Sequence, residues 1–179
     1  MFFIFALLAS TAFAAIAPRP VPRTASKIFV ESGVFEGGTP IAAHIQGLRF
    51  SRNAKTGVER WVLDFSDAKT KNYQLMAPEF QVKLLPSEKV KVADGKEVLL
   101  TPPRIIVYLD SIKTSQLDEY RLQKLIKRSK LVRTIRVYPP IEDGDRAIEF
   151  VLKKEALLEP HQPLQKEGRL VLDLKPRQD

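Results

Sequence analysis

The sequence predicts a mainly β fold: a β-sandwich of two symmetry-related sheets, built from a duplicated strand unit with one helix between the halves. Val, Ile, Tyr and Phe are frequent in short runs, and the 13 prolines outnumber the 8 glycines, which favours brief strands over long helices. One Arg-led string recurs four times, as RWVLDF from Arg60, RIIVYL from Arg104, RAIEFV from Arg146 and RLVLDL from Arg169. The 179 residues suffice for one packed domain and scarcely for two.

The amino-terminal stretch has the features of a signal peptide. MFFIFALLASTAFA, residues 1–14, is an apolar run that ends in a small-x-small pattern, after which a signal peptidase cuts. The run is shorter than the roughly 20 apolar residues that span a bilayer. We therefore expect an exported protein of the periplasm or cell envelope, with no membrane span after cleavage.

A Pro-rich segment separates this leader from the folded part. Residues 15–27, AIAPRPVPRTASK, lack any periodicity and predict an extended tether of the polyproline type. The folded domain is expected over 28–176. The chain has no cysteine, so its stability must come from core packing and not from disulfides.

Two hairpins of similar sequence organise the domain. GLRF precedes RWVLDF, and TIRVY precedes RAIEFV, each across a turn-rich loop. Each hairpin is followed later by a lone Arg-led strand, RIIVYL in the first half and RLVLDL in the second, which predicts a duplicated unit. The first half is longer, and its extra segment carries further strand signals, among them VKVADGKEVLL with a turn at Asp94-Gly95.

Alternation along each strand predicts which side chains face the core. The expected inward residues are Trp61, Leu63 and Phe65, then Leu170, Leu172 and Leu174, and, after a slip of one residue, Ile148, Phe150 and Leu152. Because of that slip, Arg146 is not equivalent to Arg60 or Arg169 and is expected at the mouth of its strand. Two half-buried sheets that pack their apolar faces together make a β-sandwich.

One helix is predicted between the halves. SQLDEYRLQKLIKRSK begins with Ser115 three residues before Asp118, a capping-box-like start, and predicts a helix from about 116 to 129. Leu122, Leu125 and Ile126 would dock it on the sheets.

The same segment predicts a basic surface. Arg121, Lys124 and Arg128 align at i, i+3 and i+7, and seven basic residues with no acidic one lie between Arg121 and Arg136. This surface could attract phosphate or carboxylate polymers or a membrane surface, or could be a solvated helix face. The chain as a whole carries a formal charge of +8.

The paired hairpin with an Arg-apolar-apolar-apolar-Asp string, followed by GRLVLDL, resembles the AMIN domain, the amidase N-terminal module. The resemblance covers most of residues 45–176 and is closer in the second half. It implies a β-sandwich of two symmetry-related sheets that binds peptidoglycan and localises to the cell wall, as such modules do beside amidases and in pilus secretins.

The resemblance also implies that ligands bind on the outer sheet faces. The outward positions of this sequence that would bind are Arg49, Arg60, Asp64, Arg104, Tyr108, Arg136, Arg169 and Asp173. Arg could donate forked hydrogen bonds to muropeptide carboxylates, and Tyr108 could stack on a sugar ring. Ordinary cross-strand charge pairs are the alternative interpretation of the same residues.

No enzyme motif is present, and we expect no catalysis and no cofactor. His44 and His161 stand in unrelated contexts, without HExxH or cysteine, so neither is expected to bind a metal. The preferred hypothesis is a non-catalytic peptidoglycan-binding module; the alternatives are an interaction subunit of a pilus or secretion complex and, less favoured, a cell-wall hydrolase. Export argues against a nucleic-acid partner.

Overall fold

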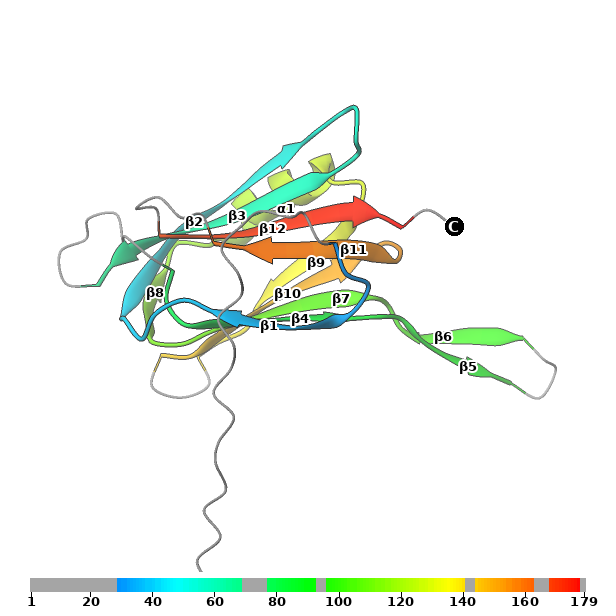
Figure 1. The fold of residues 1–179 in the computed structure, drawn as a ribbon, viewed down its shortest axis with the longest axis horizontal. Coiled ribbons are helices and arrows are strands. Elements are labelled where there is room, and N and C mark those ends of the chain that lie inside the picture. Colours follow the sequence, from blue (N-terminus) through cyan, green and yellow to red (C-terminus); the bar gives the residue numbers. More distant parts are fainter. Residues whose placement is uncertain (1–28, 69–76, 93–95, 141–143, 163–167, 178–179) are drawn as a thin grey trace, which may run out of the picture.

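Two five-stranded sheets face each other in the computed structural model, which describes residues 29–68, 77–92, 96–140, 144–162 and 168–177. The first, sheet 1, has the order β11-β12-β3-β2-β8, and the second, sheet 2, has the order β1-β4-β7-β10-β9 (Figure 1). The predicted mainly β sandwich with a single helix is confirmed in this part of the chain. The predicted signal peptide and tether lie outside the described residues.

Sheet 1 consists of β11 (Ala156–His161), β12 (Arg169–Pro176), β3 (Glu59–Asp67), β2 (Ala43–Arg52) and β8 (Ile112–Ser115). Sheet 2 consists of β1 (Gly33–Gly37), β4 (Phe80–Leu85), β7 (Arg104–Leu109), β10 (Arg146–Leu152) and β9 (Val132–Val137). All neighbouring strands are antiparallel except β2 and β8.

The strand orders of the two sheets correspond. In sheet 2, β4 and β7 of the first half lie next to the second hairpin, in the order β4-β7-β10-β9. In sheet 1, β11 and β12 of the second half lie next to the first hairpin, in the matching order β11-β12-β3-β2. The predicted hairpins are β2–β3 and β9–β10, and the predicted lone strands are β7 and β12. This order is what a duplicated unit would produce, and the duplication itself stays a prediction.

The core lies between the sheets and has the composition that strand alternation predicts. Trp61, Phe65 and Phe150 are fully buried, and the Trp61 and Phe150 rings meet edge-on across the sandwich with their centroids 5.7 Å apart. The expected inward leucines of β12 are buried as well. Arg146 begins β10, as predicted.

Some outward residues are also buried, which alternation does not predict. Val62 is 9% exposed and Val171 is 4% exposed. Both valines lie on interior strands of sheet 1, so each has a neighbouring strand on either side. The large side chains of their cross-strand neighbours, Arg49 beside Val62 and His161 beside Val171, cover them from solvent.

The helix α1 spans Glu119–Arg128 and contacts β9 and β2. It begins later than predicted because Asp118, and not Ser115, is its N-cap: the Asp118 carboxylate accepts the Arg121 backbone N–H at 2.9 Å. Leu122 and Ile126 are buried, and Leu125 packs partly buried against the core. No helix in the described residues is long and apolar enough to cross a bilayer.

A buried carboxylate fixes the far end of this helix. Glu59 of β3 is fully buried and accepts hydrogen bonds from the Ser129 hydroxyl and the Lys130 backbone N–H, both at 2.5 Å. Ser129 is the C-cap of α1, so these bonds tie the helix end to sheet 1. The last turn of α1 is thereby held close to β2 and β3.

A two-stranded hairpin projects from one end of the sandwich (Figure 1). It consists of β5 (Glu88–Lys91) and β6 (Glu97–Thr101), in the extra segment of the first half where further strands were predicted. The predicted turn at Asp94-Gly95 lies outside the described residues. It continues the β4–β7 pair outward beyond Pro86 and Pro102.

Candidate functional site

The repeated string explains the polar contacts on the outer face of sheet 1. β3 and β12 pair antiparallel so that Arg60 stands opposite Asp173 and Arg169 stands opposite Asp64. The RxVxD pattern therefore meets its own copy in the reverse direction, and each Arg lies beside the Asp of the other strand.

These pairs have good geometry. The Arg60 Nε and Nη2 atoms donate to the two Asp173 carboxylate oxygens, each at 2.7 Å. Asp64 accepts from two arginines, from Arg169 Nε at 3.0 Å and from Arg49 Nη2 at 2.7 Å. The hydrogen bonds that Arg60 donates to Asp173 raise the pKa of Arg60 above its usual value, against the opposing effect of burial.

The outer face of sheet 2 carries a second arrangement of the same kind. Glu149 of β10 is 7% exposed and accepts from Arg136 Nη1 at 3.0 Å and from the Tyr138 hydroxyl at 2.9 Å. Arg104 Nε lies 3.8 Å from its other carboxylate oxygen. The hydrogen bonds with Glu149 and then Tyr138 raise the pKa of Arg136.

The two arrangements occupy corresponding strands. Asp64 lies between arginines from β12 and β2, and Glu149 lies between arginines from β7 and β9, which are the matching strands of the two sheets. We call these two sets the arginine clamps: Arg49, Asp64 and Arg169 in sheet 1, and Arg104, Glu149 and Arg136 in sheet 2.

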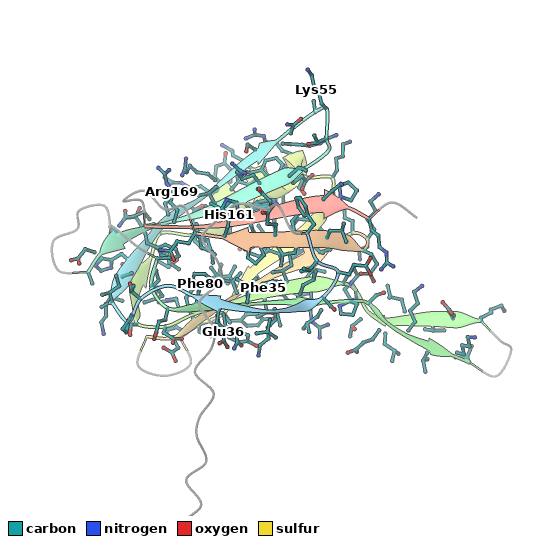
Figure 2. All side chains as sticks on the ribbon, in the orientation of Figure 1. Phe35, Glu36, Lys55, Phe80, His161 and Arg169 are labelled. Atoms are coloured by element: carbon teal, nitrogen blue, oxygen red, sulfur yellow. The ribbon has the colours of Figure 1, made fainter. Side chains whose placement is uncertain are left out.

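The eight residues expected to bind ligand do not form one surface. Arg49, Arg60, Asp64, Arg169 and Asp173 share the outer face of sheet 1, and Arg104, Tyr108 and Arg136 share the outer face of sheet 2. Figure 2 shows Arg169 on the upper sheet and Glu36 beneath the lower one, on opposite sides of the sandwich.

Sequence reasoning missed the acid of the second clamp. Alternation in RAIEFV already places Glu149 opposite the core, but the only acids among the predicted binding residues were those of the Arg-x-x-x-Asp string, which β10 lacks. Tyr108, expected to stack on a sugar, has the Lys83 ammonium 4.9 Å from its ring centroid.

The arginines on the outer sheet faces already have intramolecular anionic partners. A ligand carboxylate that used Arg60 or Arg136 would have to compete with Asp173, which is 2% exposed, or with Glu149. Such a competition leaves a poorly hydrated carboxylate without its partner, which is costly. The outer faces are therefore better suited to cross-strand pairing than to carboxylate recognition.

The predicted basic surface lines an open groove of about 500 Å³ between α1 and β2. We call it the basic groove; its lining residues are Leu48, Arg121, Lys124, Leu125 and Arg128. The two leucines are partly buried and the three cations are exposed, so the groove joins an apolar surface to positive charge.

The cations of the basic groove are less neutralised than those of the clamps. Arg121 pairs with Asp118 at 3.1 Å. Lys124 lies 4.2 Å from the Tyr120 ring centroid, and the Arg128 guanidinium lies 5.4 Å from that of Phe50. Within the described residues neither Lys124 nor Arg128 has a carboxylate partner.

The histidines lie apart. His44 Nδ1 is 2.6 Å from the Thr114 hydroxyl, and His161 Nδ1 is buried on β11 with no hydrogen-bond partner among the described residues. In the part of the chain that the structure describes, no three His, Cys, Asp or Glu side chains are grouped as metal ligands.

Comparison with protein-family models, curated proteins and solved structures finds no match to this chain.

Proposed function

We propose that this chain is a non-catalytic module of the cell envelope that binds peptidoglycan through the basic groove and so localises to the wall. The observation that carries the proposal is that Lys124 and Arg128, which have no carboxylate partner among the described residues, line the same groove as the apolar side chains of Leu48 and Leu125. Stem peptides of peptidoglycan offer carboxylates next to apolar side chains, which is the matching chemistry.

Three further features support this proposal. The leader predicts export, the hairpin and string pattern resembles the AMIN domain, and the three cations of the groove lie on a helix that is capped at both ends. A rigid helix can present its cations in a fixed geometry, which lowers the entropic cost of binding.

The test is retention on insoluble peptidoglycan sacculi by the purified chain. Replacing Arg121, Lys124 and Arg128 together with Gln should weaken retention roughly tenfold or more at low salt, because charge-assisted hydrogen bonds are lost, and less at high salt, where they are screened. Gln has a helix propensity close to that of Lys and Arg, so α1 should persist.

The matched control removes the same charge elsewhere. Lys55, Lys113 and Lys154 are exposed and do not line the groove, and Lys55 stands at the tip of the β2–β3 hairpin (Figure 2). Their triple Gln variant should bind like the wild type. Equal losses in both variants would indicate attraction by net charge alone and would contradict a groove-specific site.

A third variant distinguishes the basic groove from the outer face of sheet 1. Arg169→Ala removes one of the two arginines that contact Asp64 and leaves the groove intact. We expect unchanged sacculus binding. If Arg169→Ala abolishes binding and the groove variant does not, the ligand contacts the outer face and the basic groove is a solvated helix surface.

A further inference from the structure

The β5–β6 hairpin exposes apolar side chains that the sandwich does not cover. Val90 is 43% exposed, Val98 44%, Leu99 51% and Leu100 61%. Within the described residues β5 and β6 pair only with each other. A two-stranded ribbon of this length is marginally stable in water on its own, so an additional strand would stabilise it.

The two edges of the ribbon differ in how they are protected. β5 carries Lys89 and Lys91, and lysines on an edge strand discourage further pairing. β6 has three consecutive apolar residues, Val98 to Leu100, with no charge among them. The unprotected edge of the hairpin is therefore that of β6.

The hydrogen-bond pattern shows which backbone groups that edge offers. The Val92 N–H donates to the Lys96 carbonyl at 2.9 Å, and Val90 stands opposite Val98. Because bonded and non-bonded pairs alternate in an antiparallel ladder, the peptide groups of Glu97 and Leu99 point away from β5. Both positions precede the bulge near Leu100, where the register shifts.

We propose that β6 pairs antiparallel with β6 of a second copy of this chain, about a two-fold axis at Val98. Glu97 of each copy then stands opposite Leu99 of the other, and their outward N–H and C=O groups form four hydrogen bonds across the axis.

The side chains fit this register. One row across the four strands is Val90, Val98, Val98 and Val90, an apolar β-branched ladder of the kind that stabilises sheets. On the other face, Glu97 stands between Lys91 of its own ribbon and Leu99 of the partner copy, so no like charges are opposed. The equivalent pairing of two β5 edges about Val90 would oppose Lys89 to Lys91, which disfavours it.

The absence of cysteine from the sequence makes the register directly testable. In the proposed pairing the two Val98 residues face each other at a non-hydrogen-bonded position, where Cα atoms lie about 4.5 Å apart, within reach of a disulfide. The two Leu100 residues would be displaced along the strands by about 14 Å, beyond disulfide reach.

The experiment compares Val98→Cys with Leu100→Cys in the purified chain under mild oxidation. We expect the Val98→Cys dimer to form at least roughly ten times faster, although Leu100 is the more exposed position. Equal rates, or faster cross-linking of Leu100→Cys, would overturn the register.

Sedimentation of the wild-type chain over a range of concentrations completes the test. A reversible dimer is expected, and Val98→Lys should make it monomeric without lowering the melting temperature, since Val98 lies outside the core. A wild type that remains monomeric at every concentration would refute the proposal. The groove triple variant should still dimerise, so failure of this inference and failure of wall binding are distinguishable.

Discussion

The outer face of sheet 1 and the basic groove both present arginines, and they differ in what surrounds them. On the sheet face Arg60 and Arg169 lie beside Asp173 and Asp64, whose carboxylates are largely covered. In the groove Arg128 lies over an aromatic ring and has no described carboxylate partner. An arginine that a sequence repeats is thus not automatically one that can bind a ligand.

The physical reason is strand pairing. An Arg-x-x-x-Asp string that pairs antiparallel with its own copy neutralises itself, so its charges contribute to the register of β3 and β12. A helix has no such partner strand, and the segment from Arg121 to Arg136 contains no acidic residue that could neutralise its cations. Charges on the sheet face are therefore expected to affect stability, and charges in the groove to affect binding.

The largest effect should come from the core side of the same strand. Leu172 is 1% exposed and stands opposite Trp61 in the register, so Leu172→Ala should remove about 2–5 kcal/mol of unfolding free energy. Thermal or denaturant unfolding measures the loss. A variant that is soluble but already unfolded would also agree with the prediction. A loss under about 1 kcal/mol would mean that β12 does not close the core.

Much of this core could be predicted from the sequence. Period-two alternation identified the inward residues of β3, β10 and β12, because one buried face constrains every second position. The prediction of α1 was right in existence and in its docking face, and wrong at its start, where Ser115 instead accepts the Leu117 N–H. Ser115 and Asp118 can both act as an N-cap, and the local sequence does not decide which of them begins the helix.

The candidate sites were less predictable. Alternation assigns a residue to a face, but it does not say which strand lies alongside, and the clamps depend on the neighbours β12–β3 and β7–β10. The partners Asp64 and Arg169 are far apart in sequence, so their ion pair could not be read from spacing. The basic groove was anticipated through its cations, whereas its apolar lining residue Leu48 comes from β2, a distant segment.

An effect of intermediate size on the unfolding free energy is expected for the Arg60–Asp173 pair, and it should differ between its two members. Arg60→Ala leaves a carboxylate that is 2% exposed without its main cation, whereas Asp173→Asn leaves a guanidinium that is 46% exposed and can hydrate. We expect a loss of about 1–3 kcal/mol for Arg60→Ala and a smaller one for Asp173→Asn.

Denaturant unfolding of both variants beside Lys124→Gln sharpens the contrast between sheet face and groove. Lys124 is exposed, so its replacement should change the unfolding free energy by less than about 0.5 kcal/mol. If Arg60→Ala were equally silent, the sheet-face pairs would contribute nothing to stability and would be available to a ligand after all.

The smallest expected effect on stability concerns Asp110, whose charged neighbour is another acid, Asp145, and not an arginine. Partial desolvation of this largely exposed carboxyl first, and the charge of Asp145 second, raise the pKa of Asp110 above its ordinary value of 3.8. The folded state therefore holds this proton more tightly than the unfolded chain, and stability falls as the pH rises from that ordinary value through the raised pKa of the folded state. Asp110→Asn should raise the melting temperature slightly at pH 7, as expected for an exposed site where effects stay within about 0.5 kcal/mol.

The gain should vanish at a pH well below 3.8, where Asp110 is protonated in both states. Asp145→Asn should give a smaller gain, because it relieves only the second cause and its side chain also accepts the Ser111 N–H at 3.3 Å. A gain from Asp110→Asn that persists unchanged at low pH would show that the carboxylate's charge is not its source.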